Sequence, residues 1–300
     1  MDVKKWLAMQ SDSATSVFHM GNYCHQWKAS TFHTGKPSFH IVMNGHCWLQ
    51  INNDKKRRKL NAGDMVFFFT NIPFYIMSSE KTPVTELPAR EMLSFAEKKE
   101  ESTSLICGFL NARLRSLELL FALMPEFIII NTHCPAYNRL SSLLQLLRME
   151  CIEVDDTCEI KITRLTDLLL VYLLEEATKK QSLDINLIKL SDNARFLDLI
   201  LTIHASPQNS WSVESMAEHV HMSRSTFIRK TEELSGYTPN EMLTRIRINV
   251  AQKLIQRGCP IERIAADVGY HSSVGFYKAF RRTTGLPPGQ WSSQLQRTIY

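Results

Sequence analysis

Two short segments of the chain carry side chains that could bind a nucleic acid. Residues 213–234 read VESMAEHVHMSRSTFIRKTEEL, and residues 261–282 read IERIAADVGYHSSVGFYKAFRR. The second half of each segment gathers hydroxyl, arginine and lysine side chains. Such groups bind phosphate, and a guanidinium can also pair with two acceptors on the edge of guanine. The repetition indicates two similar elements that each present one such set.

Each segment has the pattern of two helices joined by a short turn. In the first half of both segments, apolar residues recur at i, i+3, i+4 and i+7, the spacing of one helix face. They are Val213, Met216, Ala217 and Val220, then Ile261, Ile264, Ala265 and Val268. Ser212 can cap the first helix, and Ser223 and Ser272 can cap the helix that follows in each copy. The pattern predicts two helix-turn-helix elements.

The second helices also correspond to each other. Four residues of the first copy recur 49 positions later. They are Ser223, Phe227, Gly236 and Pro239, matched by Ser272, Phe276, Gly285 and Pro288. Phe227 and Leu234 are expected to face inward in the first copy, and Phe276 and Phe280 in the second.

Two positions depart from the correspondence. Thr231 stands where the second copy has the inward Phe280, and His221 stands where the second copy has Gly269. Gly269 can adopt the left-handed conformation that often ends a helix. The first copy is therefore expected to pack less tightly than the second.

The segment between the copies predicts a long connecting helix. Thr238 and Glu241 form a capping-box pattern, and Pro239 occupies the first helical position. The helix would run to Gly258 and measure about 28 Å at roughly 1.5 Å per residue. Since successive major grooves on one face of B-DNA lie roughly 34 Å apart, such a helix could hold two others in adjacent grooves.

Two segments, MSRSTF at 222–227 and IAADVGYHSSVGFYKAFRRTTGLPPGQW at 264–291, resemble the C-terminal domain of the AraC/XylS family of bacterial transcription regulators. The resemblance spans residues 193 to 294 and includes both copies. It implies that residues 224–234 and 273–282 are recognition helices and that the partner is double-stranded promoter DNA. It also implies an activator that works with RNA polymerase.

The helical positions divide these side chains into two expected roles. Base edges are expected to be contacted by Ser225, Ile228, Arg229, Ser273, Val274, Tyr277 and Lys278. Phosphates are expected to be contacted by Ser223, Arg224, Lys230, Ser272, Arg281 and Arg282. Arg229 is the strongest candidate for a base contact, because a bidentate guanidinium–guanine pair gives roughly 1–3 kcal/mol of discrimination. The alternative for any single arginine is a solvated helix face.

The first part of the chain has strand-like patterning. FHIVMNGHCWLQI and LNAGDMVFFF combine apolar segments with Asn-Gly and Ala-Gly-Asp turns, which predicts short antiparallel strands. The same two segments resemble the cupin-type β-barrel that one branch of the AraC family uses as a sensor. Behind it, Leu140, Leu143, Leu144 and Leu147 share one helical face, and Ile162, Leu168, Leu169 and Leu173 share another.

These patterns predict an α+β multidomain chain. The expected parts are a cupin-like sensor barrel over 1–130, a helical dimerisation or cover region over 131–180, a linker over 181–192, and an all-α tandem helix-turn-helix DNA-binding domain over 193–300. The apolar run 168–174 must be buried by another surface, either the barrel that these helices cover or a second subunit. The corresponding helices often form a dimer interface in the resembling family, so we expect a homodimer through one of these helices, with simple covering of the barrel as the alternative.

The sequence leaves the sensed signal open between a small effector and an oxidant. An apolar or aromatic effector could be lined by Phe39, Trp48, Phe67 and Phe69, with packing in the core as the alternative for each. A thiol sensor would use Cys24 and Cys107, with inert buried cysteine as its alternative.

A metal-dependent cupin enzyme with a helical appendage is the competing class. His40 and His46 remain as candidate ligands, but TNIPFY replaces the usual P-x-G-x-x-H and no Glu completes a triad. We therefore expect no metal, no cofactor and no enzymatic activity. A third class, a helical interaction module without DNA contact, predicts no salt-dependent binding to any duplex.

Composition agrees with a folded cytoplasmic protein without a membrane partner. The longest apolar run, 168–174, is far shorter than the roughly 18 residues that cross a bilayer. The seven cysteines contain no CxxC pair, which argues against a zinc finger and a disulfide framework. Of the net charge of +5, residues 191–300 contribute +4, from 13 Lys and Arg against 9 Asp and Glu.

Overall fold

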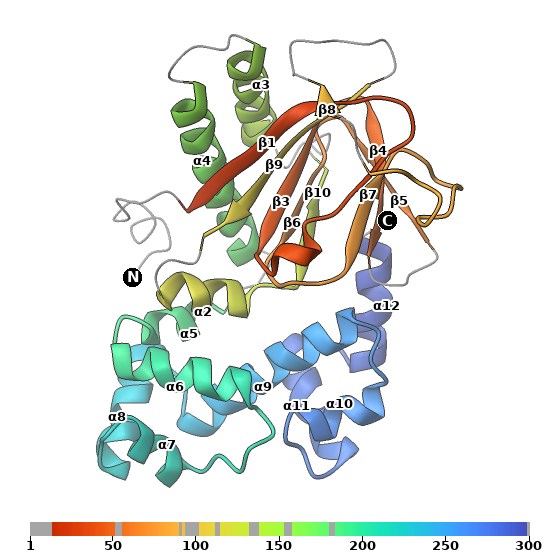
Figure 1. The fold of residues 1–300 in the computed structure, drawn as a ribbon. Helices are drawn as coiled ribbons and strands as arrows, with labels where there is room; N and C mark the ends of the chain where they lie inside the picture. The colour runs from red at the N-terminus through yellow and green to blue at the C-terminus, as the bar shows by residue number, and fades with distance from the viewer. Residues whose placement is uncertain are drawn as a thin grey trace. The chain divides into compact units, whose positions relative to one another are not determined.

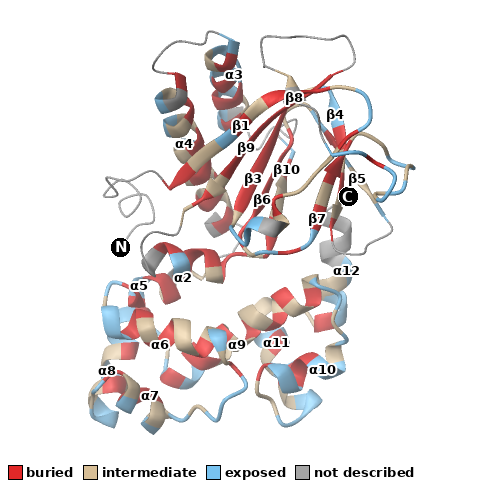
Figure 2. Cartoon of the chain, in the orientation of Figure 1, coloured by how far each residue is buried: buried red, intermediate tan, exposed pale blue. Residues whose placement is uncertain are grey.

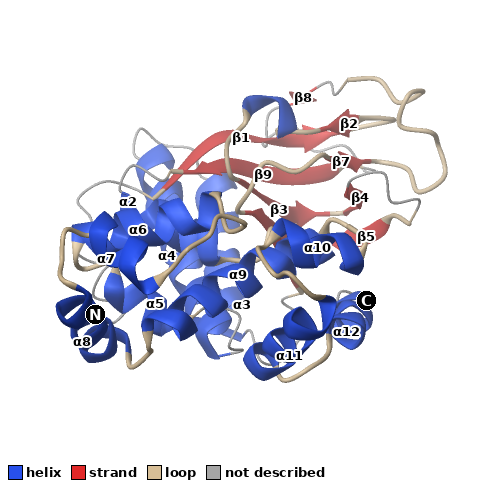
Figure 3. Ribbon diagram, turned by 90° about the horizontal axis from the view of Figure 1, so that it is seen from below, coloured by secondary structure: helices blue, strands red, loops and turns tan. Residues whose placement is uncertain are grey.

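The computed structural model describes residues 14–51, 56–89, 92–93, 102–111, 115–131, 138–152, 158–179 and 184–298. The chain divides into two compact units (Figure 1). Within the described residues, the barrel unit lies in the ranges 2–111 and 126–177, and the helical unit lies in 112–125 and 178–300. In Figure 3 the strands are red and the helices blue, so the strand-rich and helical parts can be told apart.

The barrel unit contains two antiparallel sheets. The first has the order β10 (Phe127–Ile130), β6 (Met65–Phe68), β3 (Ser38–Asn44), β9 (Thr103–Leu110), β1 (Thr15–Tyr23) and β8 (Met92–Leu93). The second has the order β2 (Lys28–Ala29), β7 (Phe74–Met77), β4 (His46–Ile51) and β5 (Arg58–Asn61), and a short 3-10 helix, η1 (Phe32–Thr34), precedes β3. The predicted region of short antiparallel strands is confirmed.

The predicted Asn-Gly turn joins β3 to β4. Gly45 has a φ of 72°, and a Cβ at this position would lie 2.7 Å from the carbonyl oxygen of Ser102. Both the left-handed backbone and the close approach therefore require glycine.

The two faces of the first sheet have different surroundings. His40 of β3 pairs with Cys107 of β9, and its ring centroid lies 5.3 Å from that of Phe74 in the second sheet. His40 and Cys107 therefore face the interior between the sheets. Since successive side chains of a strand point to opposite faces, Phe39 points to the outer face.

Two helices cover the outer face of the first sheet, α3 (Asn138–Ile152) and α4 (Cys158–Lys179). Cys151 of α3 contacts Met20 of β1 through the two sulfur atoms at 3.9 Å. Asp167 of α4 accepts hydrogen bonds from the backbone N–H and the hydroxyl of Thr15 at 2.9 and 2.7 Å. The predicted helices are confirmed, but Leu168 is 41% exposed rather than buried with the rest of its face.

The helical unit contains elements from two separate parts of the sequence. They are α2 (Arg115–Leu123), α5 (Ile185–Leu190), α6 (Ala194–Ala205), α7 (Val213–His219), α8 (Arg224–Ser235), α9 (Pro239–Gln256), α10 (Ile261–Asp267), α11 (Ser273–Thr284) and α12 (Pro288–Thr298). Helix α2 comes from between the barrel strands β9 and β10 and packs on α6. Helix α5 lies within residues 181–192, the expected linker, and packs on α8.

The helix starts follow the capping residues of the sequence. The hydroxyls of Ser223 and Ser272 accept hydrogen bonds from the backbone N–H three residues on, at 3.3 and 3.2 Å. Thr238 and Glu241 form the reciprocal bonds of a capping box at the start of α9. With 18 residues, α9 is about 27 Å long at roughly 1.5 Å per residue.

One expectation about α8 is wrong. Leu234 was expected to face inward, but it is 39% exposed. The buried face of α8 instead runs through Phe227, Thr231 and Ser235, which follow one another at steps of four residues. Figure 2 shows the buried side of each helix in red.

Within the described residues, no helix is long and apolar enough to cross a membrane. The described part of the chain also contains no group of three or more His, Cys, Asp or Glu placed to hold a metal ion. The two candidate ligands lie on different sheets, since His40 is buried in β3 and His46 is exposed at the start of β4.

Candidate nucleic-acid interface

Helix α8 presents the first set of predicted DNA contacts. Phe227 is fully buried and fixes the inward side of the helix. Ser225, Ile228 and Arg229 follow the spacing i, i+3 and i+4, so they share one face. The predicted contacts Ser223, Arg224, Ser225 and Arg229 are exposed, and Ile228 and Lys230 are partly exposed.

Helix α11 repeats this arrangement. Phe276 and Phe280 are fully buried on its inward side. The predicted contacts Ser272, Ser273, Val274, Tyr277, Lys278, Arg281 and Arg282 are all exposed. Val274 is 66% exposed and Tyr277 40%, and apolar groups at such positions suit contact with the methyl group of thymine.

Helix α9 joins the first module, α7 with α8, to the second module, α10 with α11. Its Ile248, Ala251 and Ile255 belong to the core of the second module. Arg247 donates to the carbonyl oxygens of Pro207 and Asn209 at 2.9 and 3.0 Å, in the loop before α7. The two modules are therefore both attached to α9.

The two outward helices differ in charge. Helix α8 carries three Lys and Arg residues and two Glu residues, whereas α11 carries three Lys and Arg residues and no acidic residue. In the first module, Arg224 Nε lies 2.6 Å from Glu214 Oε1 and Arg229 Nη1 lies 2.8 Å from Glu233 Oε1. A hydrogen bond from its own backbone N–H, and then Arg224, holds the pKa of Glu214 below its usual value. In the absence of DNA, each of these two arginines therefore lies beside an acidic side chain of its own module.

Comparison with known proteins places the chain in a family. Residues 10–178 match a family model described as Cupin, and residues 216–294 match one described as Helix-turn-helix domain. The RCS-specific HTH-type transcriptional activator RclR of Escherichia coli is 30% identical over 222 residues, 71% of this chain and 76% of the relative. The chain belongs to the AraC family of transcription regulators with an N-terminal cupin domain.

Two further relatives of this AraC-family regulator match most of its length. An uncharacterized HTH-type transcriptional regulator of Haemophilus influenzae is 29% identical over 268 residues, 87% of each chain. A putative AraC-like transcription regulator of Streptomyces lividans is 25% identical over 264 residues, 84% of this chain and 85% of the relative. The predicted fold class is confirmed, and the family consists of transcription regulators rather than enzymes.

The structure brings together three of the four aromatic residues that were predicted to line an effector pocket. The rings of Phe39 and Phe67 lie 5.9 Å apart, and those of Phe67 and Phe69 lie 6.5 Å apart. All three are at most 2% exposed and belong to the outer face of the first sheet. Trp48 is partly exposed on β4 of the second sheet, beside the buried Cys47.

The two predicted redox thiols lie at different places along β1 and β9. His19 is opposite Cys107, and Tyr23 is opposite Thr103. Cys24 comes after Tyr23, so five residues, or about 17 Å of strand, separate its position from that of Cys107. A disulfide requires Cα atoms roughly 4.4–6.8 Å apart. Cys107 instead has Cys47 nearby, whose thiol pKa is raised by burial and then by Cys107 and Asp64.

The sequence singled out His40 and Cys107, but it did not indicate that they lie beside His19 in the interior between the sheets. His19 and His40 are 5% and 4% exposed and flank Cys107 on either side in the sheet. The hydroxyl of Tyr23 forms a hydrogen bond with Nε2 of His19. Because side chains alternate along the strand SFHIVMN, His40 and Phe39 point to opposite faces of the sheet. Which of them points inward is shown only by contact with the second sheet, where Phe74 lies beside His40.

Proposed function

We propose that this AraC-family regulator binds two adjacent major-groove segments of promoter DNA through α8 and α11. The observation that carries the proposal is that both helices begin with the same serine cap and present hydroxyl and cationic side chains outward. Both are attached to α9, whose length of about 27 Å approaches the roughly 34 Å groove repeat. The regulator would act in the cytoplasm as an activator that works with RNA polymerase.

The exposed side chains divide into base and phosphate contacts. Base edges would be contacted by Ser225, Ile228, Arg229, Ser273, Val274, Tyr277 and Lys278. Phosphates would be contacted by Ser223, Arg224, Lys230, Ser272, Arg281 and Arg282. Base contacts determine which sequence is bound, and phosphate contacts determine register and salt dependence.

Selection of bound duplexes from a random pool, repeated with Arg229→Ala and Lys278→Ala, tests these roles. Arg229→Ala should relax the preference at one base pair by roughly 1–3 kcal/mol, and Lys278→Ala should relax a different base pair. Gln208→Ala, an exposed change in the loop before α7, is the control. Site preferences that stay unchanged in both variants would refute the assignment of these helices as the reading elements.

The regulator would act as a homodimer that forms through α3 and α4. Leu146, Met149 and Ile152 of α3 are 43%, 59% and 61% exposed, and Ile160 of α4 is 64% exposed. Clustered exposed apolar residues are typical of interaction sites. In sedimentation at micromolar protein, Met149→Lys should convert dimer to monomer, whereas Gln145→Lys, on the exposed side of the same helix, should not. A monomeric wild-type protein would contradict the proposal.

The signal would act on the cupin barrel, with a small effector as the first candidate and an oxidant as the second. The oxidant is kept because the similar E. coli regulator is called RCS-specific. Reporter assays with Cys24→Ser and Cys107→Ser separate the two. An oxidant response that survives both substitutions rules out these thiols as the sensor.

A further inference from the structure

The segment that carries α2 leaves the barrel unit and returns to it. The chain enters the helical unit after Asn111 and re-enters the barrel unit at Glu126. Asn111 N donates to the carbonyl of Ala14 at 2.8 Å, and Phe69 N donates to the carbonyl of Glu126 at 2.9 Å. Both ends of the segment are therefore bonded to the barrel backbone, close to the ends of β9 and β10.

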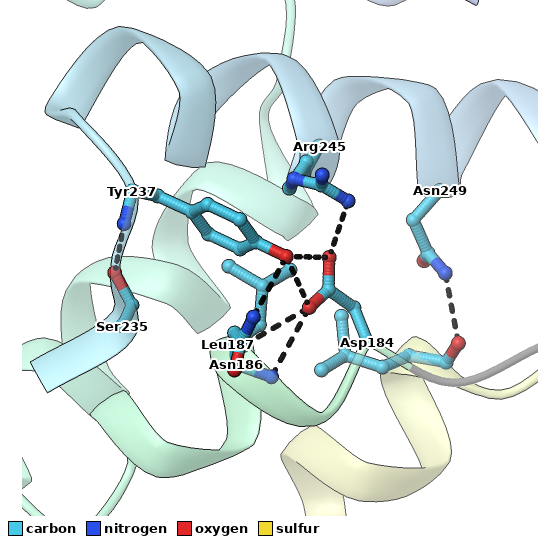
Figure 4. Close-up of polar contacts among 8 residues, drawn as sticks. Asp184, Asn186, Leu187, Ser235, Tyr237, Arg245 and Asn249 are labelled. Carbon is cyan, nitrogen blue, oxygen red and sulfur yellow. Dashed lines mark hydrogen bonds and ion pairs between the residues drawn. The ribbon is translucent and has the colours of Figure 1, made fainter. Parts of the chain in front are cut away.

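Helix α9 holds the C-terminal end of α2. The side-chain amide of Asn249 donates to the carbonyl oxygen of Leu123 at 2.8 Å (Figure 4), and Lys253 Nζ donates to that of Ala122. The last carbonyls of a helix lack intrahelical partners, and the helix dipole favours a cation beside them. Lys253 is only 5% exposed, so its charged group is largely shielded from water where it meets the end of α2.

Helix α6 adds a third polar group to the same contact. Burial, and then the charge of Lys253, lowers the pKa of His204 to about 4, while hydrogen bonding to Asn249 and to the Ala122 backbone acts in the opposite direction. His204 is therefore a neutral imidazole near the end of α2. The apolar side of α2 is buried as well, since Leu119, Leu120 and Leu123 are at most 2% exposed.

The chain also passes between the two units after Ala177, and the segment that follows contacts α9 as well. After Ala177 the chain leads to α5, whose N-cap is Asp184. Arg245 Nη1 of α9 lies 3.0 Å from Asp184 Oδ2, and the hydroxyl of Tyr237 donates to Asp184 Oδ1 at 3.1 Å (Figure 4). The guanidinium of Arg245 lies over the Tyr237 ring at 4.1 Å. Helix α9 therefore forms polar contacts with the C-terminal end of α2 and with the N-cap of α5.

The three residues of α9 that form these contacts lie on one side of the helix. Arg245, Asn249 and Lys253 follow one another at steps of four residues and so form a stripe along the helix. We propose that this α9 stripe is the surface through which the barrel unit controls DNA binding. Docked α2 and α5 hold α9 in the arrangement that sets the spacing of α8 and α11. A signal that moves β9 or β10 releases α2 and weakens DNA binding.

Lys253→Met and Asn249→Ala in the full chain test the proposal, which rests on the proposed DNA binding. Methionine fills the buried volume without the charge. Gln208→Ala, at an exposed position in the loop before α7, is the control. Hydrogen exchange is measured first, without DNA. Both variants should raise exchange of the α2 amides by about tenfold, with exchange in β9 and β10 unchanged.

DNA affinity is measured next, on a duplex selected by the wild-type chain and on the same duplex with one half-site scrambled. Both variants should weaken binding to the intact duplex by about fivefold and leave binding to the scrambled duplex unchanged, and Lys253→Arg should restore part of the loss. The proposal is overturned if α2 exchange matches the control, if exchange in β9 and β10 rises equally, or if α2 is loosened without a change in affinity. A wild-type chain that binds no duplex refutes the DNA-binding proposal instead, while the exchange result still shows whether the stripe holds α2.

Discussion

The first and second helix-turn-helix modules share a backbone frame but differ in the side chains that complete it. In each module a residue with positive φ lies two positions after the end of the first helix, His221 at 55° and Gly269 at 84°. The next residue donates its N–H to the carbonyl five positions earlier, at 2.9 Å in both modules. The two modules therefore share the hydrogen-bond frame of the turn but differ in packing and charge.

The cores show the same divergence. Phe280 of the second module is fully buried, and its ring lies 5.7 Å from that of Phe276 and 5.8 Å from that of Trp291. Thr231, at the corresponding place, is also fully buried, but its hydroxyl donates to the carbonyl of Phe227 at 2.7 Å. The second module is stabilised at this position by aromatic packing and the first by a buried hydrogen bond.

The largest expected effect is on the stability difference between the cores of the two modules. Phe280→Ala removes a buried ring and should lower the free energy of opening of α11 by about 3–5 kcal/mol. Thr231→Val keeps the volume and loses one hydrogen bond, so it should lower the free energy of opening of α8 by about 1 kcal/mol. Native-state hydrogen exchange of the two helices measures both quantities. Equal losses in the two modules would contradict the difference in packing.

The second module's turn should tolerate a side chain poorly. A Cβ at Gly269 would lie 2.6 Å from Nη2 of Arg247 and 2.7 Å from the carbonyl oxygen of Pro207. Left-handed backbone alone costs a non-glycine residue about 1–2 kcal/mol, and this crowding adds to it. Gly269→Ala should therefore lower the free energy of opening of α10 and α11 by roughly 2 kcal/mol. Unchanged hydrogen exchange in both helices would show that Arg247 moves aside without cost.

The first module's turn should respond in the opposite direction. His221 holds the left-handed conformation with a side chain, so His221→Gly removes the steric cost of that backbone. The free energy of opening of α7 and α8 should rise by about 0.5–1 kcal/mol. Exchange of these helices is compared with that of α10, which should not change. A loss of stability instead would mean that the exposed imidazole makes a stabilising contact of its own.

The modules could be predicted from the sequence because their signals are local. Ser223, Ser272 and the Thr238–Glu241 box depend on residues within one helical turn, and each starts a helix as expected. The sequence predicts Leu234 rather than Thr231 on the buried face, because a residue with a hydroxyl group is not expected in a core. Thr231 is nevertheless buried, because its hydroxyl donates a hydrogen bond to the carbonyl of Phe227 in the same helix.

Long-range placements could not be predicted in the same way. The sequence of α2, which lies within the range expected for the barrel, gives no indication that this segment packs on α6 and α9 rather than beside the strands that precede and follow it. Its place depends on Asn249 and Lys253, more than 120 residues later in the chain. Likewise, alternation separates Phe39 from His40, but which of them faces the second sheet depends on Phe74 across the barrel.

The charge contrast predicts different salt dependences for the two modules. Arg281 belongs to a helix without acidic residues, whereas Arg224 is paired with Glu214 and would have to leave it to contact a phosphate as proposed. Arg281→Gln should reduce the slope of log affinity against log salt by about 0.9, the value for one phosphate contact. Arg224→Gln should reduce the slope by less. Titration of a labelled duplex at several salt concentrations measures the slopes, and equal reductions would contradict the contrast.

The smallest expected effect concerns the ion pair between Arg229 and Glu233. To contact a base as proposed, the guanidinium of Arg229 would have to leave Glu233. Glu233 also places an acidic side chain on the helix that would face DNA. Because exposed pairs one helical turn apart are weak, Glu233→Gln should raise DNA affinity by only about twofold. Glu262→Gln, on the first helix of the second module, is the control. The preferred base at the Arg229 position should stay the same, since the contacting group is unchanged. A change in that preference, measured by selection from a random pool, would show that Glu233 itself takes part in base selection, and the two modules would then differ in how they read DNA and not only in how strongly they bind it.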